Sequence, residues 1–139
     1  MNVEEIRQTL GIETPPSQRT DGIWWHIAGL NVCHMAQYLI QNEARLITIT
    51  AIPDGKSECR LIYHWDCQGQ LLHLSTLTQG RKIDSVAAIC PAADWIEREI
   101  HDLFGVIFNG RETSPLVLRA SDPSGLFLAN IPLDEEGKE

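Results

Sequence analysis

The sequence predicts an α+β fold, a two-layer sandwich in which a mixed, mainly antiparallel sheet of four to five strands carries helices packed on one face. Two helical patterns precede a series of neighbouring strand patterns, and a third helical pattern follows them. The chain has 139 residues, 43% of them hydrophobic, which suits one domain with an ordinary core.

The first part of the chain predicts two helices and one strand. Helices are expected at 3–10 and 32–40, a proline-containing loop at 13–22 and a strand at 23–28. Gly11 is a suitable end for the first helix, and Asn31 is a suitable N-cap for the second.

The middle of the chain is a series of strands separated by turn residues. Strands are expected at 46–52, 58–65, 71–78 and 83–90. In the second of these strands, alternate side chains should share one face of the sheet: Cys59, Leu61, Tyr63 and Trp65.

The third helix is expected from Trp95 to Phe104. Asp94 is a suitable N-cap with Glu97 as its capping-box partner, and Gly105 is a suitable end. An apolar stripe predicts one face toward the core: Ile96, Ile100, Leu103 and Phe104.

The other side of this helix is strongly charged. Arg98 and Asp102 are four residues apart and can pair, as can Glu97 and His101, although such exposed pairs contribute only about 0.2–0.5 kcal/mol each. From spacing alone, a solvated charged face is the simplest interpretation.

The run from Ala93 to Val106 also resembles a long family signature, W-x-E-R-E-x-x-D-x-F-G. This is the signature of the 30-kDa subunit of respiratory NADH:quinone oxidoreductase (complex I). The family includes related subunits of membrane-bound [NiFe] hydrogenases and formate hydrogenlyases. Residues 58–64 and 83–86 are similar to upstream family segments, so the resemblance covers roughly residues 40–110. The signature residues are Trp95, Glu97, Arg98, Glu99, Asp102, Phe104 and Gly105.

After the signature the chain departs from the usual complex I pattern, F-x-G-H-P-x-L-R-R. Phe108 and Gly110 match this pattern, but Arg111 and Glu112 stand in place of its His-Pro, and its paired arginines are missing. These differences favour a subunit of a hydrogenase or formate hydrogenlyase type of complex, with complex I as the close alternative.

The resemblance implies a non-catalytic accessory subunit that docks on the large catalytic subunit of complex I or of a [NiFe] hydrogenase. It implies that this chain binds no cofactor, while NAD, quinone, iron–sulfur and nickel–iron centres belong to partner subunits. Electron transfer coupled to ion translocation is the expected activity of the whole complex. We expect a family-like domain at 1–108 and an extended tail at 109–139 that is partner-bound or flexible.

Composition excludes several other functions. A net charge of −8 argues against nucleic acid as a partner and against direct binding to anionic lipid. No stretch has the roughly 20 apolar residues needed for direct membrane insertion. The acidic N-terminus does not resemble a signal peptide, so a cytoplasmic location is expected, at the inner face of the membrane through the complex.

The cysteines give no sign of a metal or iron–sulfur site. No Cys-x-x-Cys pair occurs among the four cysteines, which are Cys33, Cys59, Cys67 and Cys90. The five histidines have no metal-ligand spacing to one another.

Two other function classes remain open. An enzyme could use Glu97, Glu99, His101 or Asp102 as a general acid or base, but the chain has no nucleophile elbow or phosphate loop beside them. A free-standing binding or regulatory module could have kept the fold and lost the complex.

Overall fold

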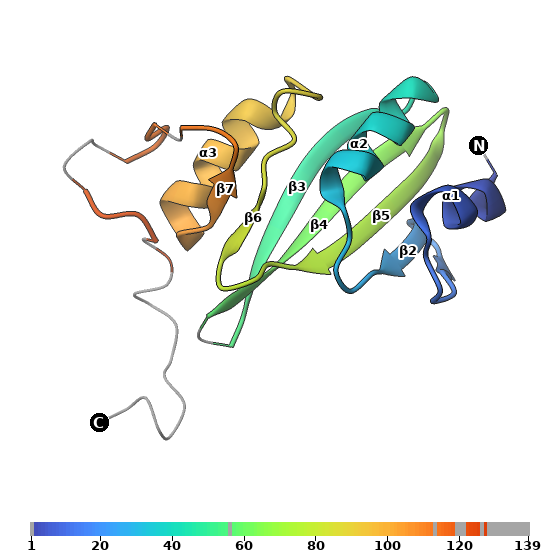
Figure 1. Cartoon of the computed structure of the whole chain (residues 1–139), viewed down its shortest axis with the longest axis horizontal. Helices are drawn as coiled ribbons and strands as arrows, with labels where there is room; N and C mark the ends of the chain where they lie inside the picture. Colours follow the sequence, from blue (N-terminus) through green and yellow to red (C-terminus); the bar gives the residue numbers. More distant parts are fainter. Residues whose placement is uncertain (1, 56, 113, 119–121, 126, 128–139) are drawn as a thin grey trace.

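The computed structural model describes residues 2–55, 57–112, 114–118, 122–125 and 127 (Figure 1). The helices are α1 (Val3–Leu10), α2 (Val32–Gln41) and α3 (Ala93–Phe104). The strands are β1 (Ser17–Arg19), β2 (Gly22–His26), β3 (Arg45–Asp54), β4 (Glu58–Cys67), β5 (Gln70–Leu77), β6 (Lys82–Asp84) and β7 (Ile107–Asn109). The main sheet has five strands in the order β1-β2-β5-β4-β3, and a two-stranded sheet pairs β6 with β7.

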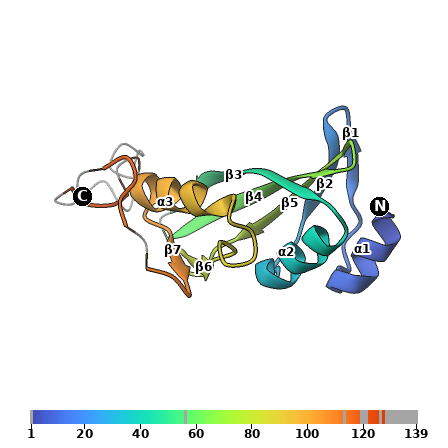
Figure 2. The same ribbon diagram turned by 90° about the horizontal axis from the view of Figure 1, so that it is seen from above.

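The main sheet is mixed, as predicted. Strand β2 runs parallel to β5, whereas the other neighbours in this sheet pair antiparallel. With helices α1 and α2 on one side of the sheet (Figure 2), this arrangement confirms the predicted α+β sandwich.

The core lies between the sheet and helices α1 and α2 and continues to α3 and β7, whose residues Ile100 and Phe108 belong to the same buried cluster. The predicted inner-face residues of β4 are all buried: Cys59, Leu61, Tyr63 and Trp65. Met35 and Leu39 of α2 and Ile6 of α1 belong to the same buried cluster. The two-residue alternation of β4 and the helical spacing of α2 therefore both point into this core.

Two predicted segments are wrong in detail. The expected loop at 13–22 contains strand β1, which pairs with β2. The expected strand at 83–90 is reduced to β6, because the chain turns after Asp84 and the N–H of Cys90 donates to the carbonyl of Val86. Both Val86 and Cys90 are buried, so their apolar character reflects core packing rather than a strand.

Much of the expected C-terminal tail lies outside the described residues, at 113, 119–121, 126 and 128–139. The described tail residues include 114–118, which bind to α3. The predicted domain boundary at 108/109 stays a prediction.

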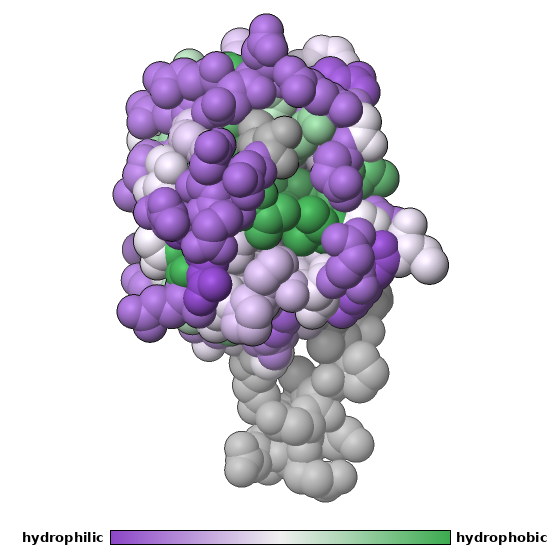
Figure 3. Space-filling view, turned by 90° about the vertical axis from the view of Figure 1, so that its right-hand side faces the viewer, coloured by the Kyte–Doolittle hydropathy of each residue, from purple (hydrophilic) through white to green (hydrophobic). Residues whose placement is uncertain are grey.

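The surface near α1 is mostly hydrophilic, with some hydrophobic side chains grouped at its centre (Figure 3). Within the described part of the chain, no helix has the length and apolar character required to cross a bilayer.

Candidate functional site

The candidate site is built on α3, which carries the family-like signature. The helix begins at Ala93, and its N-cap is Ala92, whose side chain makes no capping bond. The prediction that Asp94 caps the helix is therefore wrong; Asp94 lies in the first turn. Gly105 ends the helix with a φ of 68°, as predicted, because this left-handed conformation favours glycine.

Glu97 is fully buried and holds three chain segments together. Its carboxylate accepts hydrogen bonds from the Ser85 hydroxyl at 2.6 Å, the Val86 N–H at 2.8 Å and the Arg111 guanidinium at 3.3 Å. Arg111 also forms an ion pair with Asp94. Loss of water on burial raises the pKa of Glu97, and these hydrogen bonds oppose the shift only in part.

Asp102 is the second buried carboxylate and binds the segment after β7. Its Oδ2 accepts backbone N–H bonds from Leu116 and Val117 at 2.8 Å and from Leu118 at 3.2 Å. Burial acts to raise the pKa of Asp102, but the three donors outweigh it and the pKa is lowered.

Arg98 binds the same segment from the next turn of the helix. Its guanidinium donates to the carbonyl of Ser114 at 3.1 Å and to that of Pro115 at 2.9 Å. The structure thus gives Arg98 and Asp102 separate partners in residues 114–118. His101 Nδ1 donates to the carbonyl of Val106 rather than pairing with Glu97. The predicted pairs along the helix are therefore wrong.

The other signature residues differ in exposure. Trp95 is 67% exposed and Glu99 is also exposed, whereas Phe104 is half-buried and packs edge-on against Phe127. The simple interpretation of a solvated charged face is therefore wrong for Glu97 and Asp102, which are buried, and holds for Glu99.

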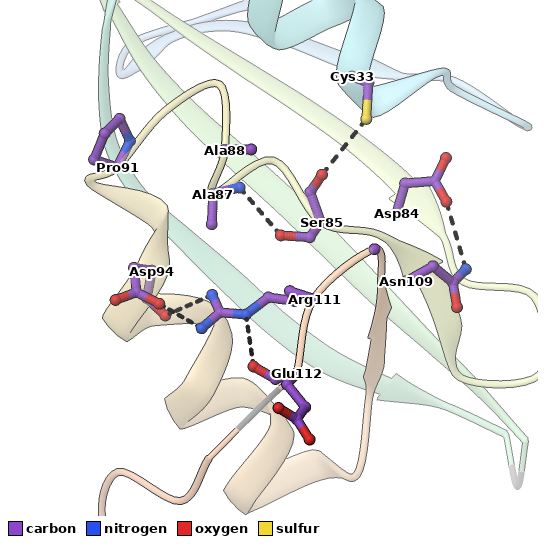
Figure 4. A pocket seen from close by; sticks show the side chains of 11 residues that line it. Cys33, Asp84, Ser85, Ala87, Ala88, Pro91, Asp94, Asn109, Arg111 and Glu112 are labelled. Carbon is purple, nitrogen blue, oxygen red and sulfur yellow. Dashed lines mark hydrogen bonds and ion pairs between the residues drawn. The ribbon is translucent and has the colours of Figure 1, made fainter.

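A hollow of about 610 Å³ opens beside the N-terminal half of α3 (Figure 4). Its wall includes the ion pair of Arg111 and Asp94, the half-buried thiol of Cys33, and Ser85. Cys33 donates weakly to the Ser85 carbonyl at 3.5 Å. Burial and nearby carboxylates raise the pKa of Cys33, so the thiolate that reacts as a nucleophile or metal ligand is disfavoured.

The arrangement has the character of a structural clamp. A Ser–Glu pair can serve as a nucleophile and base, but the Ser85 hydroxyl also accepts the Ala87 N–H, and the Glu97 carboxylate is occupied by Val86 and Arg111. The described residues include no cluster of three histidine, cysteine or acidic side chains that could hold a metal ion.

Two residues of the clamp were not predicted. Arg111 stands where the family pattern has histidine, so the sequence indicated only that a family residue was missing there. In the structure, Arg111 forms the ion pair with Glu97 from that position. Ser85 lies in the segment similar to the family, but no spacing rule connects it to Glu97, twelve residues away.

Comparison with known proteins identifies the family. The model of "Respiratory-chain NADH dehydrogenase, 30 Kd subunit" matches residues 26–133, most of the chain. The chain belongs to this 30-kDa subunit family. This confirms the predicted resemblance and extends it beyond residues 40–110.

Individual members of the 30-kDa family match shorter segments. The C subunit of the NADH-quinone oxidoreductase of Geobacter metallireducens is 39% identical over 61 residues, 43% of this chain and 38% of that protein. Its counterpart in Cereibacter sphaeroides is 36% identical over 70 residues, 47% of this chain and 35% of that protein. The matched segments thus span less than two-fifths of these relatives.

Solved structures share the fold of this 30-kDa family member. The trypsin-resistant fragment 1–134 of Nqo5 aligns with a TM-score of 0.60 at 22% identity, covering 79% of this chain and 94% of the fragment. A chain of the membrane-bound sulfane sulfur reductase, an archaeal respiratory membrane complex, aligns with a TM-score of 0.65 at 23% identity. That alignment covers 88% of this chain and 77% of the other.

Proposed function

We propose that the chain is a non-catalytic accessory subunit of a membrane-associated redox complex. It docks on the large catalytic subunit in the peripheral arm, at the inner face of the membrane, and supports electron transfer coupled to ion translocation. It binds no cofactor itself; NAD, quinone, iron–sulfur or nickel–iron centres belong to its partners. Membership of the 30-kDa family supports this proposal.

The observation that carries the docking proposal is the exposure of Trp95. Glu97, Arg98 and Asp102 make contacts within the chain, but the Trp95 indole remains 67% exposed. Tryptophan is enriched among residues that dominate the binding energy of interfaces. Trp95, with the exposed carboxylate of Glu99 one turn later, therefore forms the proposed docking surface on α3.

A hydrogenase type of complex is the first candidate for the parent. The family's usual His-Pro and paired arginines are absent, and Arg111 binds Glu97 from the first of these positions. Complex I is the alternative. The large subunit that accompanies the chain decides between them.

The test is purification of the tagged full chain from its native host in mild detergent, with co-eluting proteins identified by mass spectrometry. A nickel–iron large subunit supports the hydrogenase type, and a quinone-site subunit with NADH-oxidising partners supports complex I. A chain that elutes alone contradicts the proposal and favours a free-standing module. Stoichiometric iron or nickel in the isolated chain contradicts the absence of a cofactor.

The docking surface is tested with Trp95→Ala and Glu99→Lys. We expect each to reduce recovery of the large subunit at least tenfold while the thermal midpoint of the isolated chain stays within a few degrees. Ile40→Ala on α2 is the matched control, because Ile40 is also an exposed large apolar residue. Equal recovery with Trp95→Ala and the control contradicts docking through α3.

A further inference from the structure

The side of the sheet opposite α1 and α2 carries no described helix over β2 and β5 (Figure 2). The side chains of this open face are fixed by strand register. Trp24 pairs with His73, His26 with Ser75, and both partners pair onward with β4. The open face therefore carries a mixed set of aromatic, basic and apolar groups: Trp24, His26, Arg60, Ile62, His64, His73 and Ser75.

A hollow of about 270 Å³ lies on this face and collects side chains from β1, β2, β4 and β5. The Arg19 guanidinium lies 4.9 Å from the centre of the Trp24 ring. The Arg60 guanidinium lies 3.4 Å from His26 Nδ1, and that nitrogen lies 2.9 Å from the hydroxyl of buried Ser75. Two guanidinium groups and an imidazole thus border one hollow.

The charged residues that line this hollow are basic, although the chain as a whole is acidic; the carboxylate of Asp21 accepts from the Trp24 indole N–H at 2.8 Å and interacts with Arg19. The whole chain carries −8, yet the charged lining residues are Arg19 and Arg60. Arg60 pairs with Asp54 at 3.6 Å, with side chains 36% and 48% exposed. Such an exposed pair adds little to stability, so an incoming carboxylate can replace Asp54. Guanidinium forks bind carboxylates in a planar, bidentate geometry.

The apolar lining distinguishes a peptide from a free anion. Trp24 forms part of the wall and Ile62 is buried in the lining, so the hollow also offers apolar contact. An inorganic anion uses only the charged groups, whereas an acidic peptide segment with an apolar side chain uses both kinds.

We propose that the hollow bordered by Arg19, His26 and Arg60 binds an acidic segment of a partner protein of the complex. Carboxylates of that segment bind the two guanidinium groups, and an apolar side chain contacts Trp24. This inference rests on the proposed accessory function and adds a second docking surface, separate from Trp95 on α3.

The experiment places the photocrosslinking residue p-benzoylphenylalanine at Ser17, which lines the hollow, in the full tagged chain. After irradiation in native membranes, the crosslinked peptide is sequenced by mass spectrometry. We expect a segment of a partner protein that carries at least two carboxylates close to an apolar residue. A peptide without carboxylates, or one from a second copy of this chain, contradicts the proposal.

The charge variant is Arg19→Gln with Arg60→Gln. We expect its crosslink yield to fall at least fivefold at about 50 mM salt, with partial recovery in the Arg19→Lys, Arg60→Lys variant. Arg45→Gln is the matched control, because Arg45 is an exposed arginine of β3 outside the hollow. Unchanged yield in the double glutamine variant contradicts the proposal, as does complete loss of the crosslink in 10 mM phosphate or glutamate.

The outcome also separates this inference from the proposed function. A wild-type chain that recovers no partner protein contradicts the accessory function itself. A wild-type chain that recovers the complex through Trp95, but gives no acidic crosslink from position 17, contradicts only the second docking surface. Thermal melting of the isolated double variant, expected within a few degrees of wild type, excludes unfolding as the cause of any loss.

Discussion

Glu97 and Asp102 are two buried carboxylates of one helix whose pKa values shift in opposite directions. Burial raises the pKa of Glu97 above its ordinary value near 4.5. At Asp102 burial acts in the same direction, but three backbone N–H donors outweigh it and lower the pKa below the ordinary 3.8. The two residues therefore contribute to stability over different ranges of pH.

For Asp102 the folded state binds its proton less tightly than the unfolded state. Its contribution is present above the unfolded pKa, near 3.8, and is lost as the pH falls through the lower folded value. We expect Asp102→Asn to lower the free energy of unfolding by about 1–3 kcal/mol at pH 7. This difference should shrink toward pH 3 in urea titrations.

For Glu97 the sign is reversed. The folded state binds this proton more tightly, so its contribution is complete below the unfolded pKa and declines as the pH rises through the folded value. Glu97→Gln should remove this decline. The difference in free energy of unfolding between wild type and Glu97→Gln should therefore change above about pH 4.5, whereas the difference for Asp102→Asn changes below about pH 4. Parallel stability curves for wild type and both variants would contradict the two shifts.

At the level of single residues, the sequence predicted the helix that carries the family signature but not the hydrogen-bond partners of its charged side chains. Helical spacing relates Arg98 to Asp102 and Glu97 to His101, since it describes only neighbours along one helix. The observed partners of these side chains come from segments five to seventeen residues away. A single sequence carries no spacing rule for such contacts. The exposure of Trp95 likewise depends on how α3 packs.

Among the helices and strands, too, some could be predicted from the sequence and others could not. The sequence predicted α1, α2 and the long strands β3 to β5 because their apolar residues follow regular periods. It did not predict β1, whose three residues are all exposed and have no apolar pattern. The sequence predicted a mixed sheet but not that β2 and β5 are its parallel pair, because this pairing joins segments about fifty residues apart.

Strand β2 depends on a close backbone approach at Gly22. This residue has a φ of 121°, and an added Cβ would lie 2.5 Å from the carbonyl oxygen of Leu71. We expect Gly22→Ala to lower the free energy of unfolding by about 2 kcal/mol or more, because the positive φ disfavours alanine and the added methyl group would clash with Leu71. Thermal and urea unfolding of the isolated chain measure this loss.

Gly69→Ala is the control for Gly22→Ala. Gly69 also has a positive φ, 92°, but no atom lies within 4 Å of an added Cβ. Its substitution should cost only the conformational strain, about 1 kcal/mol. Equal losses for the two variants would show that contact with Leu71 does not limit β2.

At the scale of the whole molecule, the two proposed docking surfaces lie toward opposite ends of the sheet. Helix α3 lies beyond the β3 edge (Figure 1), whereas the hollow extends from β4 across β5 and β2 to β1 at the other edge. A subunit with this arrangement can bridge two neighbours, which suits an accessory role in a large complex.

Separate surfaces predict additive effects on assembly. Distant sites without shared partners usually combine within about 0.3–0.5 kcal/mol. We therefore expect the fold-losses in complex recovery caused by Trp95→Ala and by the Arg19→Gln, Arg60→Gln variant to multiply when combined. Only the second fold-loss should shrink when salt rises from about 50 to 300 mM, because screening weakens the charge attraction that the wild type has and the variant lacks, whereas apolar burial is not screened. If the triple variant recovers as much of the complex as Trp95→Ala alone does, one surface acts through the other, and the molecule does not bridge two partners.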